Sequence, residues 1–265
     1  MKTACLAIAA LALAAPALAQ DFALQRLEAS PRHHEWLTVK VGDRAVQTFV
    51  AYPKASTKAT AVVIIHENRG LSDWVRGVAD QLAEAGYIAL APDLLTGAGP
   101  GGGRTSDFPS SDAAREAISK LQTDQVLAGL DAVVDQARKL PSNNGKVAIA
   151  GFCWGGGQSL RMATHRTDLA AAFIFYGNFD YTKDDLARIK SPVYGFYGGA
   201  DERIGATVPG TDAAMRELHK AFEPVTYEGA GHGFMRSGED PAGPEADRKA
   251  RDAAWERWRR LLSTL

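Results

Sequence analysis

Short apolar runs alternate along this chain with longer stretches in which apolar residues recur at helical spacing. The short runs predict strands, because several of them, such as AVVIIH, are almost continuously apolar and β-branched, which is typical of strands buried on both faces of a sheet. The predicted strands cover residues 45–52, 61–66, 87–91, 146–152, 171–176, 193–197 and 224–227. The predicted helices cover residues 73–85, 121–140, 155–164, 183–189, 211–221 and 244–262.

The order of these elements predicts the fold class. Strands separated by helices form parallel sheets through right-handed crossovers, so we expect an α/β protein with a mostly parallel central sheet and helices on both faces. Functional sites of such sheets lie at the carboxyl ends of the strands. Two segments fall outside the pattern. Residues 20–40 are predicted to be irregular, with His33 and His34 exposed, and the glycine-rich residues 97–103 (GAGPGGG) to form a flexible loop.

The first 19 residues have the composition of a secretory signal peptide. Lys2 gives a positive start, residues 6–15 are apolar, and the sequence ALA at 17–19 fits an A-x-A cleavage motif. The apolar stretch is shorter than the roughly 20 residues that span a bilayer. We therefore expect cleavage after this motif and export of a mature domain, residues 20–265, to the periplasm or the medium. The alternative is a buried N-terminal helix.

Composition and charge narrow the class of partner. The chain has 265 residues and a formal net charge of −1, from 30 Lys and Arg against 31 Asp and Glu. This balance gives no reason to expect binding to nucleic acid or to an anionic membrane surface, so we expect a small-molecule partner and a monomer. The histidines show no convincing metal-ligand spacing, so no metal site is predicted.

The two cysteines have different fates in this interpretation. Cys5 falls inside the predicted signal peptide, which leaves Cys153 as the one thiol of the mature chain and allows no intramolecular disulfide. A lone thiol is liable to oxidation in an oxidising compartment, so its presence calls for a reason. One interpretation is that Cys153 is a small, inert residue buried in the core. Its neighbours in the sequence suggest another.

Residues 147–157 (VAIAGFCWGGG) predict a strand, then G-x-C-x-G, then a helix. This is the pattern of the nucleophile elbow of α/β-hydrolases, with sulfur in place of the serine oxygen. A strand that turns at once into a helix strains its central residue, and side chains two positions before and after it would collide, which explains Gly151 and Gly155. The elbow would hold the Cys153 sulfur at a helix N-terminus, where the helix dipole favours a thiolate.

An acid and a histidine follow in the order that this fold uses, nucleophile, acid, histidine. Asp201 lies just past the sixth predicted strand, and His232 lies in a glycine-rich loop past the last one. We expect His232 to act as general base, or to hold an imidazolium against the thiolate, with Asp201 fixing its tautomer. Glu202 and Asp180 are competing acids, and a purely structural histidine is the alternative for His232.

Acyl transfer also needs donors for the oxyanion that develops on the substrate. One predicted donor is the backbone N–H of Trp154, directly after the nucleophile. The other comes from the loop after an earlier strand, HENRG at residues 66–70, and is predicted to be the N–H of Asn68.

With these residues placed, the chain resembles the dienelactone hydrolase family (carboxymethylenebutenolidases) of α/β-hydrolases. The matching segments are VVIIHENRG (62–70), APDLL (91–95), GKVAIAGFCWGGG (145–157), FYG (175–177), GGADERI (198–204) and GAGHGF (229–234). They spread across nearly the whole predicted mature chain. The resemblance implies cleavage of carboxylate-bearing, dienelactone-like lactones to maleylacetate-like acids, without a cofactor, by Cys153, Asp201 and His232 through an acyl-enzyme.

The resemblance also implies roles for residues around the triad. Glu67 matches an acid that contacts the thiol and helps to form the thiolate when substrate arrives. Arg236 matches an arginine that binds the substrate carboxylate, and Arg115 or Arg104 would supply a second one. Tyr176 matches a tyrosine near the site. The alternatives are that the acid braces its loop, that the arginines are solvated surface residues, and that the tyrosine belongs to the core.

Two features depart from the family pattern. An export signal is unusual for an enzyme of intracellular breakdown, and residues 97–103 are expected to reshape the rim of the pocket. Both favour a relative that acts on other small esters or lactones. A broad carboxylesterase, a non-catalytic α/β-hydrolase that binds a carboxylated ligand, and a thiol redox protein therefore remain alternatives, although the last lacks the usual C-x-x-C pair.

Overall fold

The computed structural model describes residues 21–55 and 57–265, so the predicted signal peptide and its cleavage point lie outside the described residues. Its centre is an eight-stranded sheet with the order β1-β2-β4-β3-β5-β6-β7-β8. The first two pairings, β1 with β2 and β2 with β4, are antiparallel, and all the others are parallel. The strands are β1 (His33–Val41), β2 (Arg44–Tyr52), β3 (Ala59–Ile65), β4 (Ile88–Asp93), β5 (Asn143–Phe152), β6 (Ala172–Phe175), β7 (Val193–Gly198) and β8 (Phe222–Tyr227).

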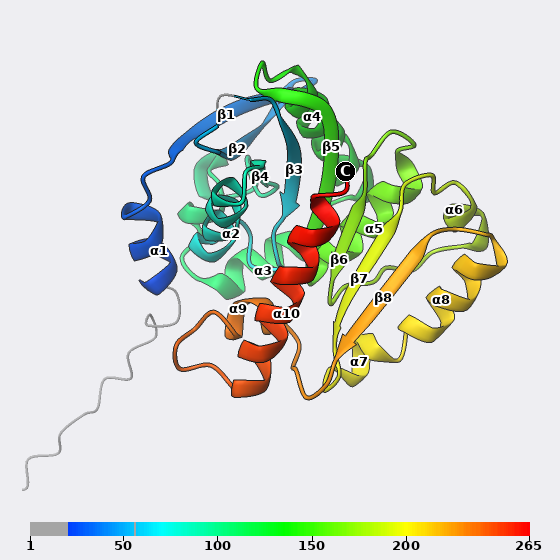
Figure 1. Cartoon of the computed structure of the whole chain (residues 1–265). Coiled ribbons are helices and arrows are strands. Elements are labelled where there is room, and N and C mark those ends of the chain that lie inside the picture. The colour runs from blue at the N-terminus through cyan, green and yellow to red at the C-terminus, as the bar shows by residue number, and fades with distance from the viewer. Residues whose placement is uncertain (1–20, 56) are drawn as a thin grey trace, which may run out of the picture.

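Helices cover both faces of this sheet (Figure 1). Helices α1, α2, α9 and α10 pack on one face, and α4, α5, α6 and α8 on the other. The helices are α1 (Asp21–Glu28), α2 (Asp73–Glu84), α3 (Ser111–Ser119), α4 (Thr123–Lys139), α5 (Trp154–His165), α6 (Lys183–Ala187), α7 (Glu202–Gly205), α8 (Val208–Glu217), α9 (Phe234–Ser237) and α10 (Glu245–Leu262). The predicted fold class, an α/β-hydrolase with a mostly parallel sheet, is confirmed.

The sheet has two apolar cores because successive side chains of a strand point to opposite faces. In β3, Val62 and Ile64 join the core under α2 and α10, whereas Val63 and Ile65 join the core under α4 and α5. Every residue of β3 is buried, which accounts for its continuous apolar sequence.

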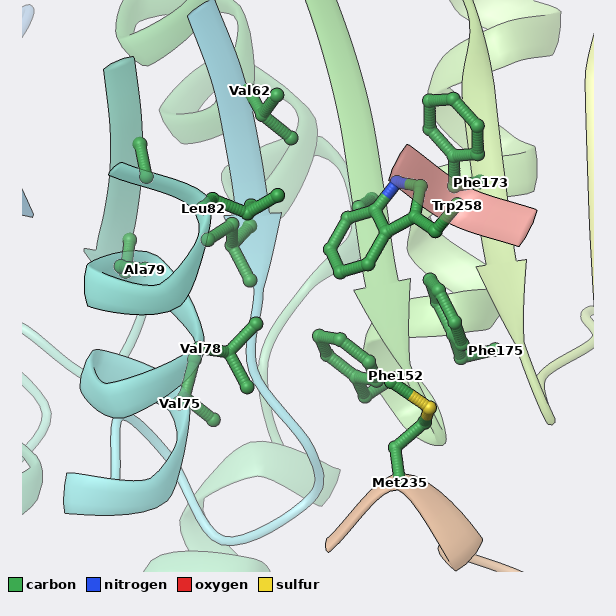
Figure 2. Packing of buried hydrophobic residues seen from close by; sticks show 14 of the residues in the cluster. Val62, Val75, Val78, Ala79, Leu82, Phe152, Phe173, Phe175, Met235 and Trp258 are labelled. Atoms are coloured by element: carbon green, nitrogen blue, oxygen red, sulfur yellow. The ribbon is translucent and has the colours of Figure 1, made fainter. Parts of the chain in front are cut away.

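The first of these cores contains an aromatic cluster, which we define as Phe152, Phe173, Phe175, Phe196 and Trp258. Figure 2 shows four of its members lying together between β5, β6 and α10. Phe175 is at its centre, with ring centroids 4.3 Å from Phe196, 4.7 Å from Phe152 and 4.8 Å from Trp258. All five rings are almost completely buried, so the cluster is a rigid base beneath the end of β5.

The segment at residues 20–40 was predicted to be irregular, but from residue 21, where the described part begins, most of it is regular. It contains α1 and the edge strand β1, which pairs along its whole length with β2. The prediction was wrong because β1 is mostly half-exposed and its apolar alternation is weak. His34 is also not a free surface residue, because its Nε2 lies 2.8 Å from Oδ1 of the fully buried Asp80, to which Arg32 also donates.

Two further segments differ from the predictions. Helix α3 was not predicted at all, although it is capped by the Ser110 hydroxyl, which accepts a hydrogen bond from the N–H of Ala113. The glycine-rich loop at residues 97–103 contains a short 3₁₀ turn, Pro100–Gly102. Helix α3 lies beside the candidate site and contributes to its walls.

Candidate active site

Cys153 occupies a sharp turn between β5 and α5. The strand ends at Phe152 and the helix begins at Trp154, so one residue carries the whole change of direction. Its φ is +55° and its ψ is −117°, a conformation that L-residues other than glycine rarely adopt. Such strain persists only where the surroundings enforce it, and it is common at functional sites. The side chain of Cys153 stays partly exposed as a result of this turn.

The glycines around the turn are required for steric reasons, as the sequence predicts. A Cβ on Gly151 would lie 1.9 Å from the carbonyl oxygen of Gly155. A Cβ on Gly155 would in turn lie 2.4 Å from the carbonyl oxygens of Ile65 and His66, at the end of β3. Helix α5 can therefore begin directly against the neighbouring strand only if both positions lack side chains.

Three loops at the carboxyl ends of the strands bring a cysteine, a histidine and an aspartate together. His232 Nε2 lies 3.1 Å from the Sγ of Cys153, and His232 Nδ1 lies 2.5 Å from Oδ2 of Asp201. Asp201 follows β7 and is only 8% exposed, and its other oxygen, Oδ1, accepts the N–H of Ile204 at 3.3 Å. Of the three acids considered from the sequence, Asp201 is the one bonded to His232.

The electrostatics of this contact favour a charged histidine. The hydrogen bond to Cys153 and, after it, the one to Asp201 raise the pKa of His232 to about 9, against burial, which acts to lower it. At neutral pH the imidazole is therefore protonated beside the cysteine sulfur. Tyr176 packs its ring against the imidazole, with centroids 5.2 Å apart and planes at 66°, and so restricts its orientation.

A cavity of about 400 Å³ opens over the cysteine sulfur. Its walls contain six of the residues that the sequence predicts for the site: Asn68, Arg115, Cys153, Trp154, Tyr176 and His232. The other lining residues are Ile118, Ser119, Gly177, Asn178, Arg203 and Ile204. The volume is in the range of small-molecule sites, and the walls combine apolar surface with a few polar groups.

The two predicted oxyanion donors lie on this cavity. Trp154 is the first residue of α5, and the first N–H groups of a helix have no partner inside the helix. Asn68 lies across the cavity in the loop after β3. The indole of Trp154 stacks on the buried ring of His66, with centroids 5.5 Å apart, which ties the two donor-bearing segments to each other.

Tyr176 is fully buried and also takes a positive φ, +39°. Burial raises the pKa of Tyr176 well above its usual value, so the phenol keeps its proton. Within the described residues its hydroxyl has no hydrogen-bond partner. Because buried hydroxyls are normally paired, this unpaired donor in a residue that lines the cavity is unusual.

Glu67 and Arg236 are bonded to each other. Arg236 Nε donates to Oε2 of Glu67 at 2.9 Å, and Glu67 is only 6% exposed. Burial acts to lower the pKa of Arg236, but Glu67 outweighs it and the net direction is upward. Neither residue belongs to the walls of the cavity over Cys153 in the part of the chain that the structure describes. Among the described residues Glu67 forms its hydrogen bond with Arg236 and none with the Cys153 sulfur, while the role of Arg236 toward a substrate carboxylate stays a prediction.

Sequence reasoning missed part of the cavity wall. Arg203 follows Asp201 by two residues, and this proximity to the predicted acid could have pointed to it. Ile118 and Ser119 gave no such indication, because α3 was not predicted, and Asn178 lies in the loop after β6 with no motif around it. Arg115 lies on α3 and lines the cavity over Cys153. It forms an ion pair with Asp112 at 2.8 Å.

Two expected contributors to the rim lie elsewhere. Arg104 lines a different cavity, and none of residues 97–103, all of which the structure describes, borders the space over Cys153. The prediction that this loop reshapes the rim is therefore wrong, because α3 occupies that position instead. Among residues 21–55 and 57–265, no three histidine, cysteine or acidic side chains are grouped to hold a metal ion. None of the helices described there is long and apolar enough to cross a membrane.

Comparison with known proteins agrees with this geometry. Residues 46–265 match the model of the dienelactone hydrolase family. A protein of Salmonella typhimurium named "Putative carboxymethylenebutenolidase" is 33% identical over 198 residues, covering 70% of this chain and 72% of that protein. One of the same name from Methylorubrum extorquens is 30% identical over 207 residues, covering 74% and 70%.

Solved structures agree as well. A crystal structure of a "Putative Dienelactone Hydrolase" from Klebsiella pneumoniae superimposes with a TM-score of 0.77 at 25% identity, covering 88% of this chain and 99% of that one. The fold and the arrangement at the strand ends define an α/β-hydrolase that acts on esters or lactones. The chain belongs to the dienelactone hydrolase family.

Proposed function

We propose that this hydrolase cleaves its substrate through a covalent acyl-enzyme on Cys153. The observation that carries the proposal is the continuous contact from sulfur to imidazole to carboxylate, 3.1 Å and then 2.5 Å. A protonated His232 beside the sulfur favours the thiolate, which is the nucleophilic form of cysteine. The positive end of the α5 dipole acts in the same direction.

The proposed reaction has two halves. The thiolate attacks the carbonyl carbon, a C–S bond forms, and the carbonyl electron pair moves onto the oxygen, which the N–H groups of Trp154 and Asn68 stabilise. The C–O bond then breaks, and His232 gives its proton to the leaving oxygen. In the second half His232 takes a proton from water, which attacks the thioester, and the C–S bond breaks to release the acid and restore the thiolate.

His232 is better placed than Glu67 to take the thiol proton in this state. The carboxylate of Glu67 is held by Arg236, whereas the imidazole is in hydrogen-bond contact with the sulfur. A role for Glu67 in forming the thiolate, as the family resemblance implies, would require the ion pair with Arg236 to rearrange when substrate arrives. We propose this role of Glu67 for the substrate-bound enzyme only.

For the substrate we propose a small lactone or ester that carries a carboxylate. Two arginines, Arg115 and Arg203, line the cavity, and no acidic side chain does so among the described residues. Of the two, Arg115 already pairs with Asp112, whereas Arg203 has no ion pair in the described chain. The relatives named as carboxymethylenebutenolidases support a dienelactone-like substrate. Arg203 is then the first candidate to bind the carboxylate.

Alkylation of the thiol tests the mechanism. We expect iodoacetamide to modify Cys153, as located by peptide mapping, and to abolish hydrolysis of p-nitrophenyl acetate in proportion to labelling. The variant Cys153→Ala should lose at least about a thousandfold in kcat. In the full chain with residues 1–19 retained, Cys5→Ser, which changes the other cysteine of the sequence, is the matched control and should hydrolyse at the unmodified rate. Full activity of the alkylated protein would exclude the thiol mechanism.

We also propose that the protein is exported and monomeric. The argument for export is the pattern of residues 1–19, which combines a positive start, an apolar stretch and an A-x-A motif. Intact-mass measurement of protein from the periplasmic fraction tests it, and a mass that includes these residues would contradict it. Light scattering after size exclusion tests the monomer.

A further inference from the structure

A second cavity of about 400 Å³ lies on the other side of the loop that carries Asn68. It is bounded by β1, by the start of α2 and by the segment leading into α3. Its lining residues are Trp36, Arg69, Leu71, Ser72, Asp73, Arg76, Asp93, Arg104, Thr105, Ser106, Phe108, Ser110, Ser111 and Ala114. None of these residues lines the cavity over Cys153, so the two spaces are separate.

The charges in this second cavity are not balanced. It contains three arginines and two aspartates, an excess of one positive charge. Asp73 bonds to Arg76. Asp93 accepts from the Thr105 hydroxyl at 2.6 Å and from the Thr105 N–H at 3.0 Å. Arg69 and Arg104 are left without a carboxylate partner among the described residues, which makes the space attractive to an anion.

An aromatic surface accompanies these cations. Trp36 is 38% exposed, which is unusual for so large an apolar side chain in this protein. The guanidinium of Arg104 lies over its ring, 4.1 Å from the centroid. A guanidinium held against a ring in this way keeps the N–H groups at its edge available for a carboxylate. Phe108 adds a second apolar ring to the walls.

We propose that this cavity is a ligand site for a small planar organic carboxylate, of the aryl carboxylate class, distinct from the site of hydrolysis. Arg104 and Arg69 would bind the carboxylate, while Trp36 and Phe108 pack against the flat apolar part. The volume is sufficient, because sites for small molecules begin at about 300 Å³. An aliphatic anion such as acetate would use the arginines but gain nothing from the rings.

The cavity is tied to the active site through shared walls. Asn68 and Arg69 are consecutive, yet Asn68 lines the space over Cys153 and Arg69 lines the second one. The loop that they occupy is anchored in the second cavity, where the Thr105 hydroxyl accepts the N–H of Leu71 at 3.0 Å. A carboxylate on Arg69 would therefore rest on the loop that carries a proposed oxyanion donor.

Calorimetric titration of the wild-type protein with benzoate tests the proposal, with acetate and the neutral benzamide as reference ligands. We expect benzoate to bind with one equivalent and more tightly than either reference. Arg104→Gln should weaken benzoate binding about tenfold or more, because hydrogen bonds to charged groups are among the stronger ones. Trp36→Leu should weaken benzoate but not acetate.

Two control variants locate the bound benzoate. Arg44→Gln removes an exposed arginine of β2 and should leave the affinity unchanged, which separates a specific effect from one of net charge. Arg115→Gln changes the cavity over Cys153 and should also leave it unchanged. Arg69→Gln, at an exposed position, repeats the test should Arg104→Gln fold poorly. Absence of benzoate binding, or binding that Arg104→Gln and Arg69→Gln leave unchanged, would overturn the proposal.

Discussion

Phe152 and Cys153 are neighbours in sequence, but Phe152 belongs to a buried apolar cluster and Cys153 to a strained, partly exposed polar site. Phe152 is fully buried in the aromatic cluster, where rings contact one another and no backbone strain is needed. Cys153 has a positive φ, a partly exposed side chain and a polar partner, His232, from a distant loop. Burial of the aromatic cluster stabilises the folded state. The turn at Cys153 instead costs free energy, because its backbone is strained, and this cost is offset by the surrounding fold.

The comparison teaches that activity and stability can be separated at adjacent positions. Changes at the strand ends should remove catalysis and leave the fold intact. Changes in the cluster should unfold the protein without touching a reacting atom. A change at Gly155 should affect both catalysis and stability, because this residue is part of the turn and packs against the backbone of β3.

The largest expected effect is the loss of the imidazole. His232→Ala should lower kcat by about a thousandfold or more, since both proposed proton transfers pass through this ring. The melting temperature should change little by comparison. The control is His165→Ala, a histidine that pairs with Asp131 on the surface and should leave kcat unchanged. Steady-state kinetics with an activated ester and a thermal melt give both readouts, and equal kcat values for the two variants would contradict the assignment.

Phe152→Ala should lower the stability of the fold. Removing a fully buried ring typically costs about 3–5 kcal/mol, from lost burial and from the cavity left behind. We expect a matching drop in the free energy of unfolding, measured by urea denaturation. Leu24→Ala, which truncates a side chain that is 38% exposed, is the control and should cost well under 1 kcal/mol. If both variants lost a similar amount of free energy of unfolding, the aromatic cluster would not contribute more to stability than the protein surface does.

Gly155→Ala should affect both properties at once. Its Cβ would meet two backbone carbonyl oxygens at 2.4 Å, so α5 must shift away from β3 and carry the turn with it. Overpacking of this kind typically costs about 1–3 kcal/mol, and we expect kcat to fall as well. Gly210→Ala in α8 is the matched control, because a Cβ there meets nothing within 4 Å. That change should be neutral or slightly stabilising in denaturation.

Arg203→Gln should have a smaller and selective effect. We expect kcat/KM to fall about tenfold for a carboxylate-bearing lactone, because a charge-assisted hydrogen bond is lost. The same variant should act on a neutral aryl ester as well as the wild type does. Arg216→Gln, which changes an exposed arginine paired with Asp212 on α8, serves as the charge-matched control. Equal losses on both substrates would remove Arg203 from substrate recognition.

The last expected effect is a dependence of stability on pH. The pKa of His232 is raised to about 9, above its value of roughly 6.5 in an unfolded chain, by its contacts with Cys153 and Asp201. The protonated ring therefore stabilises the folded state fully below pH 6.5, and this contribution disappears as pH rises through 9. The difference in free energy of unfolding between wild type and His232→Gln should shrink over this window in urea titrations. A difference that is constant from pH 6 to pH 10 would contradict a charged His232.

The sequence predicts the parts of this molecule in which local pattern and chemistry agree. The buried strands, the turn at Cys153 and the positions of Asp201 and His232 past their strands follow from continuous apolar runs and from glycines with a steric purpose. The edge strand β1 and helix α3 were missed because their burial depends on what packs beside them, and that is not written in their own periodicity. Arg203 was missed although it follows the predicted acid by two residues, and Arg104, given as an alternative to Arg115, lines the second cavity instead.

The fully buried Asp80 has a consequence for where this domain begins. The family match starts at residue 46, but the carboxylate of Asp80 on α2 forms an ion pair with Arg32 and hydrogen bonds with Ser30 and His34. A protein shortened to the matched region would leave that negative charge facing an apolar interior with no cation, a loss that typically costs about 3–5 kcal/mol. The segment before residue 46 therefore stabilises the hydrolase fold through its contacts with Asp80. We expect a protein that begins at residue 46 to be unstable.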